Sequence, residues 1–354
     1  MADDASLLLN RVLAAAAKKK AESIHLTVGT PPVLRVNTQL AELAGEAVLT
    51  EEIISAILER LLSERQRQIL VKDKQILVVN ILDDRRLRVG AYRQRGMTAV
   101  TLKIVGLVPA LLTLGLPKGV LKFSEFSHGL VIIAGPFSAG KSTTAAAIIE
   151  EINKTRKENI VTIEKPIENL FVNDRSLITQ REVGVDAASF SKALKYCRQE
   201  DVDVIMVGET ADPEVAPLLL GFAAVERLVV WQMDAVSSIQ VLRRIIAQYP
   251  ADRRQRALNI LAASLAGIIV QRLVPRIGGG LVLATEVLIA NSAVRTTIKE
   301  DRLGQLASII QTSKEEGMQD LDQSLLNLVR LGDVRIEDAT EAAVDKDNFQ
   351  ALIK

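Results

Sequence analysis

A short stretch of the chain, GPFSAGKSTT at residues 135–144, combines glycine, lysine and hydroxyl side chains at a spacing that suits phosphate chemistry. The spacing is G-x-x-x-x-G-K-S, and it lies between the apolar run LVIIAG and an alanine-rich helical pattern. In that order of strand, loop and helix, backbone N–H groups of the loop point at phosphate oxygens, and the positive end of the helix dipole attracts them further. The stretch therefore predicts a site for the phosphate groups of a nucleotide.

The residues of this loop have separate predicted roles. Glycine permits the sharp bend, Lys141 is expected to reach the β and γ phosphates, and the Ser142 hydroxyl is expected to ligate Mg²⁺. ATP and Mg²⁺ are therefore the predicted ligands. The predicted nucleotide-binding residues are Gly135, Pro136, Ser138, Ala139, Gly140, Lys141, Ser142 and Thr143.

Carboxylates that could complete a hydrolysis site follow two later apolar runs. Glu209 ends VIMVGE, while Glu164 and Glu168 lie at the exit of NIVTIE, in TIEKPIE. The carboxyl ends of parallel strands meet at one edge of a sheet, so we expect these acids beside the phosphate loop. Hydrolysis needs a metal and a group that orients or deprotonates water. Glu168 and Glu209 are the predicted catalytic residues, and Ser142 and Glu209 the predicted metal ligands; Glu164 is equally explained as an ordinary strand-end carboxylate.

The elements that must position these residues follow from the apolar pattern. From residue 130 onward, buried-strand runs (LVIIAG, NIVTIE, VDVIMVGE and RLVVWQ) alternate with helical patterns such as 190–198 and 238–248. This alternation predicts an α/β domain whose mainly parallel sheet is covered on both faces. A hairpin is expected to turn at 278–280, and short helices to follow it.

The first 108 residues have a different pattern. An amphipathic helix containing Leu7, Leu8 and Val12 is predicted first, and a second helix over 50–71. The predicted strands are 24–26, 33–36, 75–81 and 87–92. We therefore expect a smaller α+β domain over 1–108, a connector containing proline and glycine over 109–128, and the phosphate-binding domain over 129–354.

Composition limits the class of protein. The 354 residues are 48% apolar and 25% charged, with a net charge of +1 and only 3% aromatic residues, so we expect no nucleic-acid partner. The single cysteine, Cys197, suits a reducing cytoplasm, and with two histidines it leaves no structural zinc set. No apolar run reaches the roughly 20 residues that span a bilayer.

Several motifs together resemble the PilT-type twitching-motility ATPases of type IV pili, within the secretion ATPase superfamily. The resemblance rests on GLVIIAGPFSAGKSTTAAAIIEEINKTRKENIVTIEKPIENLF, QREV and VIMVGE. IHLTVGTPPVLRV, near the start, is similar to the opening of the family's PAS-like domain, and AVRTTIKE at 293–300 resembles the motif AIRNLIRE of its retraction branch. Nearly the whole chain is covered by these similarities.

The resemblance implies a RecA-like P-loop domain preceded by a PAS-like domain, a homohexameric ring, and ATP bound between neighbouring subunits. It also implies a partner, the inner-membrane platform protein of the pilus, and hence a location in the cytoplasm at the inner membrane. Glu168 would be the water-activating carboxylate of the Asp-box, and Glu209 the Walker B glutamate. Arg86, Arg88 and Arg95 are possible interface residues that would approach a neighbour's nucleotide; a solvated surface explains them equally well.

Three family signatures are altered. Lys165 replaces the Asp-box acid, Ala211 replaces the arginine after the Walker B glutamate, and the His-box reads ERLVVWQMDA, with Arg227 and Asp234 where histidines belong. If that segment lines the pocket, Trp231 should report nucleotide binding. Since groups that hold ATP differ from those that stabilise the transition state, we expect binding with reduced or lost hydrolysis, alone or with an active paralogue. A fully active motor that uses Arg227 or Asp234, and a non-catalytic scaffold, are the alternatives.

Overall fold

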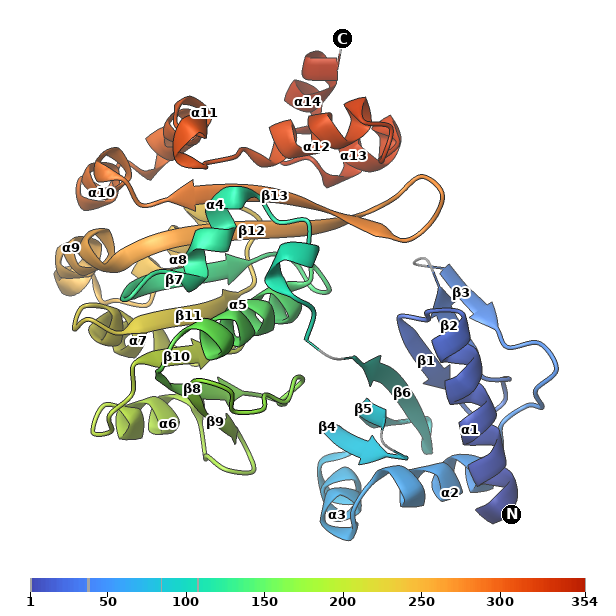
Figure 1. Ribbon diagram of the computed structural model, residues 1–354. Helices are drawn as coiled ribbons and strands as arrows, with labels where there is room; N and C mark the ends of the chain where they lie inside the picture. Colours follow the sequence, from blue (N-terminus) through green and yellow to red (C-terminus); the bar gives the residue numbers. More distant parts are fainter. Residues whose placement is uncertain (1, 37–38, 84, 107, 354) are drawn as a thin grey trace. The chain divides into compact units, whose positions relative to one another are not determined.

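The computed structural model describes residues 2–36, 39–83, 85–106 and 108–353. The chain divides into two compact units, Met1–Leu107 and Val108–Lys354 (Figure 1). Each unit has its own apolar core, as expected for domains that fold around separate hydrophobic centres.

The first unit is a six-stranded antiparallel sheet in the order β3-β2-β1-β6-β5-β4, with helices packed on it. Its strands are β1 (Ser23–Leu26), β2 (Val33–Val36), β3 (Gln39–Glu42), β4 (Gln75–Leu82), β5 (Arg85–Gln94) and β6 (Met97–Val105). Its helices are α1 (Ala2–Lys18), α2 (Glu51–Leu61) and α3 (Glu64–Asp73). Alternate residues of β5, such as Leu87 and Val89, are buried beneath the helices, so one face of the sheet forms the core.

Two helix predictions for this unit need correction. The single helix expected over 50–71 is wrong: α2 ends at Leu61 and α3 starts at Glu64. Ser63 caps α3 by accepting from the N–H of Gln66 (3.4 Å), and the Gln66 side chain accepts from the N–H of Ser63 (2.9 Å), a reciprocal pair that starts a new helix. The opening helix is confirmed; Leu8 and Val12 of its predicted apolar stripe are buried, whereas Leu7 is 59% exposed.

The second unit contains a seven-stranded sheet in the order β13-β12-β7-β11-β10-β8-β9. Neighbouring strands are parallel except for the antiparallel pair β12–β13. The strands are β7 (Gly129–Ala134), β8 (Asn159–Glu164), β9 (Leu177–Glu182), β10 (Val204–Val207), β11 (Leu228–Met233), β12 (Leu265–Pro275) and β13 (Leu281–Ile289). The predicted fold class, a mainly parallel α/β sheet after a smaller α+β unit, is confirmed.

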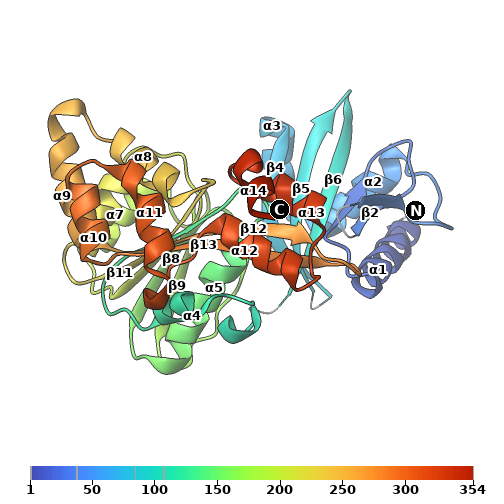
Figure 2. The same cartoon turned by 90° about the horizontal axis from the view of Figure 1, so that it is seen from above.

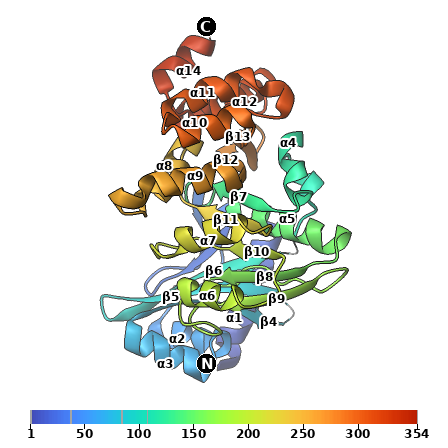
Figure 3. The same cartoon turned by 90° about the vertical axis from the view of Figure 1, so that its left-hand side faces the viewer.

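Helices cover both faces of this sheet, as Figure 3 shows. On one face lie α4 (Lys118–Leu121) and α5 (Lys141–Thr155); on the other lie α6 (Phe190–Cys197), α7 (Val215–Ala223), α8 (Ser238–Ala247) and α9 (Arg254–Ser264). The segment expected to be a connector over 109–128 packs within this unit, because Leu111, Val120 and Phe123 join the core beneath α5. Gly267 on β12 leaves room for the Phe123 ring, since a Cβ there would lie 2.7 Å from it.

The remaining helices lie along the β12–β13 hairpin, as Figure 2 shows from above. They are α10 (Ser292–Lys299), α11 (Leu306–Thr312), α12 (Leu321–Arg330), α13 (Ile336–Ala342) and α14 (Lys346–Ile353). Phe349 of α14 is fully buried against this group, so α14 is part of a core. Among the described residues, no helix is both long and apolar enough to cross a membrane.

Candidate phosphate-binding site

The loop at 135–140 joins β7 to α5 through backbone conformations that few side chains permit. Gly135 has φ +157°, and a Cβ there would lie 2.6 Å from the carbonyl oxygen of Gln271 and 2.8 Å from the Cβ of Ala139. Gly140 has φ +87° and caps α5 without any side chain, while Ser138 also has a positive φ of 61°. The first N–H groups of a 15-residue helix are thus left without a side-chain cap, an arrangement that favours an anion.

The side chain of Lys141 is only 4% exposed and folds back over this loop. Its ammonium donates to the carbonyl oxygens of Gly135 (2.7 Å) and Pro136 (2.6 Å). It also forms ion pairs with Glu209 (Nζ–Oε1, 2.7 Å) and Asp234 (Nζ–Oδ1, 3.0 Å). Four oxygens therefore share the three N–H bonds of one ammonium group.

The strand order explains why these residues meet. β11 lies between β7 and β10, and Met233 at the end of β11 is paired with Ala134 at the end of β7. Asp234 therefore follows its strand at the same level as the phosphate loop, and Glu209 follows the next strand along. The structure brings Glu209 to Lys141, as the sequence predicts, and adds Asp234.

Two buried glutamine side chains support the start of α5. The Ser142 hydroxyl donates to Oε1 of Gln232 (3.1 Å), and Nε2 of Gln271 donates to the Thr144 hydroxyl (2.7 Å). Gln232 and Gln271 are 4% and 1% exposed. Sequence reasoning missed both, although a polar residue near the end of an otherwise apolar strand, as in RLVVWQ, was the available signal. Thr143, between these contacts, is exposed on the helix.

Glu164, the last residue of β8, and Glu168, four residues later, form a second acidic group. The pKa of Glu164 is raised to about 7, mainly by burial and in smaller part by the nearby Glu168 carboxylate, while hydrogen bonds from Thr162 (2.7 Å) and Gln180 oppose the rise. β8 is separated from β7 by β11 and β10, so this group lies about 14 Å from the loop strand at the usual strand spacing. The structure thus brings Glu168 to Glu164, at a strand further from the phosphate loop than Glu209.

Two residues of the altered His-box lie away from Lys141. Arg227 precedes β11, donates to the carbonyl oxygens of Cys197 (3.3 Å) and Glu200 (3.1 Å), and lies about 20 Å along the strand from Asp234. The suggestion that Arg227 serves the site is therefore wrong. Trp231 is 2% exposed and packs in the core on the sheet face opposite α5, whereas Gln232 and Asp234 of the same segment contact Ser142 and Lys141.

The predicted interface arginines do not form one group. Arg86 and Arg88 lie two residues apart on β5 and share the sheet face opposite the buried Leu87. Arg95 lies in the turn between β5 and β6, with φ +48°, about 30 Å along the strand from Arg86.

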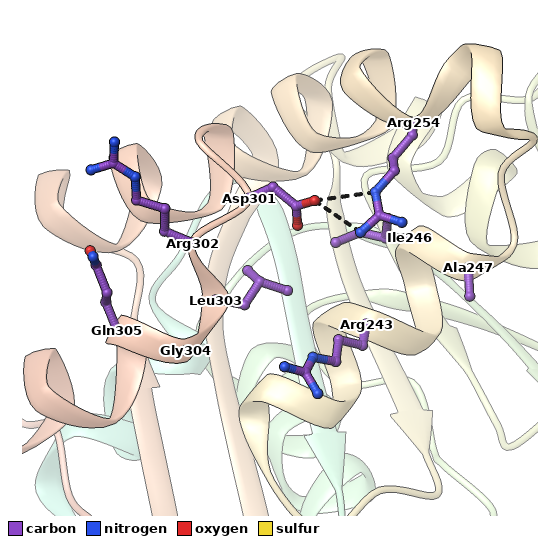
Figure 4. Close-up of a pocket in the computed structure, with 9 residues that line it drawn as sticks. All are labelled: Arg243, Ile246, Ala247, Arg254, Asp301, Arg302, Leu303, Gly304 and Gln305. Atoms are coloured by element: carbon purple, nitrogen blue, oxygen red, sulfur yellow. Dashed lines mark hydrogen bonds and ion pairs between the residues drawn. The ribbon is translucent and has the colours of Figure 1, made fainter.

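A separate open cavity of about 690 Å³ lies where α8, α9 and the loop after α10 meet (Figure 4). Arg254 faces Asp301 and donates to it from Nε (3.2 Å) and Nη2 (2.9 Å). Arg243 and Arg302 also line this cavity. The ion pair fastens α9 to the segment after α10, which gives this basic surface a structural role.

The oxygen donors beside the loop fit a magnesium ion. In the described part of the chain, no three His, Cys, Asp or Glu side chains form a preassembled metal cluster. Mg²⁺ bound with a nucleotide needs only one or two carboxylates, because phosphate oxygens and water complete its shell. Ser142, Glu209 and Asp234 supply oxygen donors of that kind.

Comparison with known proteins agrees with this arrangement. Residues 3–281 match the family model described as type II/IV secretion system protein. The chain belongs to that family. It is 35% identical to the type IV pilus retractation ATPase PilT of Pseudomonas aeruginosa over 96% of this chain and 99% of that protein, and 35% identical to a twitching motility protein of Neisseria gonorrhoeae over 90% and 86%.

Solved structures extend the similarity to three dimensions. A crystal structure of the pilus retraction motor PilT with bound ADP superposes with a TM-score of 0.84 at 36% identity, covering 96% of this chain and 98% of that one. The ATPase DotB of Legionella pneumophila has a TM-score of 0.83 at 21% identity, covering 95% of each chain, which shows a common fold alone. The predicted resemblance to PilT-type ATPases, with a RecA-like domain, is confirmed.

Proposed function

We propose that this chain is a PilT-like subunit of a type IV pilus retraction machine, or of a related secretion machine, that binds ATP and Mg²⁺ and hydrolyses ATP slowly or not at all. The observation that carries the proposal is the buried Lys141 ammonium inside a glycine-bent loop, beside Glu209. The bound ADP of the similar PilT structure supports the same ligand class.

Different residues of the site would bind the phosphates and the metal ion. Backbone N–H groups at 135–143 and the Lys141 ammonium hold the phosphate tail, while Ser142 and Glu209 hold Mg²⁺. The metal, when bound, neutralises charge on the phosphates. Glu209 lies 2.7 Å from the Lys141 ammonium, which puts the metal-binding carboxylate directly beside the phosphate-binding cation.

The groups that assist bond cleavage are less complete. Asp234 places a negative charge where the resemblance gives a histidine, and Arg227 lies at the other end of β11. Lys165 is exposed where the family has an acid, and Ala211 supplies no cation. Single positioned groups that stabilise developing charge commonly contribute a factor of about 10² or more, so their loss lowers turnover more than binding.

The test is a paired measurement on one preparation: calorimetric binding of ATP and steady-state release of phosphate. We expect saturable binding that Lys141→Ala abolishes, with little phosphate released. Rapid release that depends on Lys141 would favour an active motor instead, and nucleotide that survives purification without exchanging would favour a scaffold. Failure of the native chain to bind any adenine nucleotide would refute the proposal.

We further propose that the subunit joins a ring, with itself or with an active PilT-like relative, beside the pilus platform protein at the inner membrane. Arg86, Arg88 and Arg95 are the proposed interface residues, and Glu168 is the proposed water-activating group. The mass of the assembly with and without an ATP analogue, measured by sedimentation, tests this. A monomer under all conditions, also when mixed with an active relative, would refute it.

A further inference from the structure

Asp234 comes directly after β11 and lies beside the phosphate loop. Hydrogen bonds within its own turn hold it there. The Arg244 side chain on α8 donates to the carbonyl oxygen of Asp234. In the same turn the Val236 N–H donates to Oε1 of Gln240 (2.8 Å), and Ser237 caps α8 by accepting from the N–H of Gln240 (3.2 Å). The Asp234 carboxylate is 59% exposed, yet a hydrogen-bonded turn presents it to Lys141.

The hydrogen bonds of Lys141 leave no free donor for a phosphate. Its three N–H bonds are shared among the carbonyl oxygens of Gly135 and Pro136 and the carboxylates of Glu209 and Asp234. The carbonyls belong to the loop itself, so an incoming phosphate must displace a carboxylate. Once Asp234 is displaced, its negative charge lies beside the negative phosphates, and like charges at short range repel.

We propose that Asp234 competes with the phosphates of ATP for Lys141, and that it thereby makes the affinity for ATP depend on Mg²⁺. The inference rests on the proposed nucleotide binding. A divalent cation relieves the repulsion because carboxylate and phosphate oxygens are both suitable ligands or water-bridged neighbours of Mg²⁺. Without the metal, the displaced carboxylate loses its ion pair with Lys141 and faces the phosphate charge.

The test compares ATP binding with Mg²⁺ and with EDTA for the native chain and two variants, Asp234→Asn and Asp234→Ala. Removing a partly exposed charge pair changes an affinity by up to about fivefold. In EDTA, we expect both variants to bind ATP up to about fivefold more tightly than the native chain does. In Mg²⁺, we expect a smaller increase in their affinity for ATP. Asp252→Asn is the matched control, because Asp252 lies on a short 3-10 helix (Ala251–Arg253) and is 76% exposed.

The outcomes separate this inference from the proposed function. Tighter binding by both Asp234 variants in EDTA, with no change in Asp252→Asn, would support the competition. Unchanged or weaker binding by both variants, while Lys141→Ala still abolishes binding by the native chain, would overturn the competition and leave nucleotide binding intact. If the native chain binds no ATP in either buffer, the proposed function fails, and the inference fails with it.

Discussion

Replacing Glu164 by glutamine should make the second unit more stable at alkaline pH and leave it unchanged in acid. Burial raises the pKa of this carboxyl from 4.5 to about 7. At about 1.4 kcal/mol for each tenfold change in proton affinity, ionising Glu164 in the folded state costs about 3 kcal/mol relative to the unfolded chain. Well below pH 4.5, the carboxyl is protonated in both states, so the penalty vanishes there.

The direction in which stability changes with pH follows from the raised pKa of Glu164. As the pH rises from 4.5, the unfolded chain releases this proton first, so the free energy of unfolding falls until the pH passes 7. Glutamine has the same shape and does not titrate. Glu164→Gln should therefore unfold with a free energy larger by about 3 kcal/mol at pH 8, and by less than about 1 kcal/mol at pH 5.

Urea titrations at pH 5 and pH 8, followed by the fluorescence of Trp231, measure this effect. Trp231 is the single tryptophan of the chain and is buried in the second unit, so it reports that unit. Glu341→Gln, at an exposed position of α13, controls for the loss of one negative charge. A Glu164→Gln variant as stable as the native chain at pH 8, or less stable at both pH values, would refute the reasoning.

Other substitutions test the close packing and the helix caps. Gly135→Ala places a Cβ 2.6 Å from a backbone oxygen, so it should destabilise the second unit by about 1–3 kcal/mol in urea and weaken ATP binding by tenfold or more in calorimetry. Gly267→Ala should destabilise by about 1–3 kcal/mol because its Cβ meets the Phe123 ring, whereas Gly221→Ala, which meets nothing within 4 Å in α7, should stabilise by up to about 1 kcal/mol. Equal effects of Gly267→Ala and Gly221→Ala on the free energy of unfolding would contradict the predicted clash with Phe123. Ser63→Ala removes the cap of α3 and should lower the stability of the first unit by about 1 kcal/mol, measured by circular dichroism.

Local signals made much of the second unit predictable. The runs LVIIAG, NIVTIE and RLVVWQ are mainly apolar, and each supplies a strand of the buried sheet. The hairpin between β12 and β13 turns at glycines, as expected. The short strand β9 was missed, since its exposed edge position removes the apolar run that marks a buried strand.

The contacts of the site were less predictable because they depend on strand order. No local pattern places Asp234 beside Lys141, 93 residues earlier; that contact exists because β11 inserts between β7 and β10. The same order puts Glu168 further from the loop than its place in the sequence suggested. The break between α2 and α3 is a different case, because the S-x-x-Q pattern at 63–66 is a local capping signal that interrupts the apolar stripe.

A single-turnover experiment tests most directly whether the chain binds ATP without hydrolysing it. Protein in excess over radiolabelled Mg·ATP is quenched at intervals, and bound ATP and ADP are separated and counted. We expect the label to bind within seconds, to require Lys141 for binding, and to remain ATP for many minutes. Conversion of the bound label to ADP within seconds, or label that never binds, would contradict it.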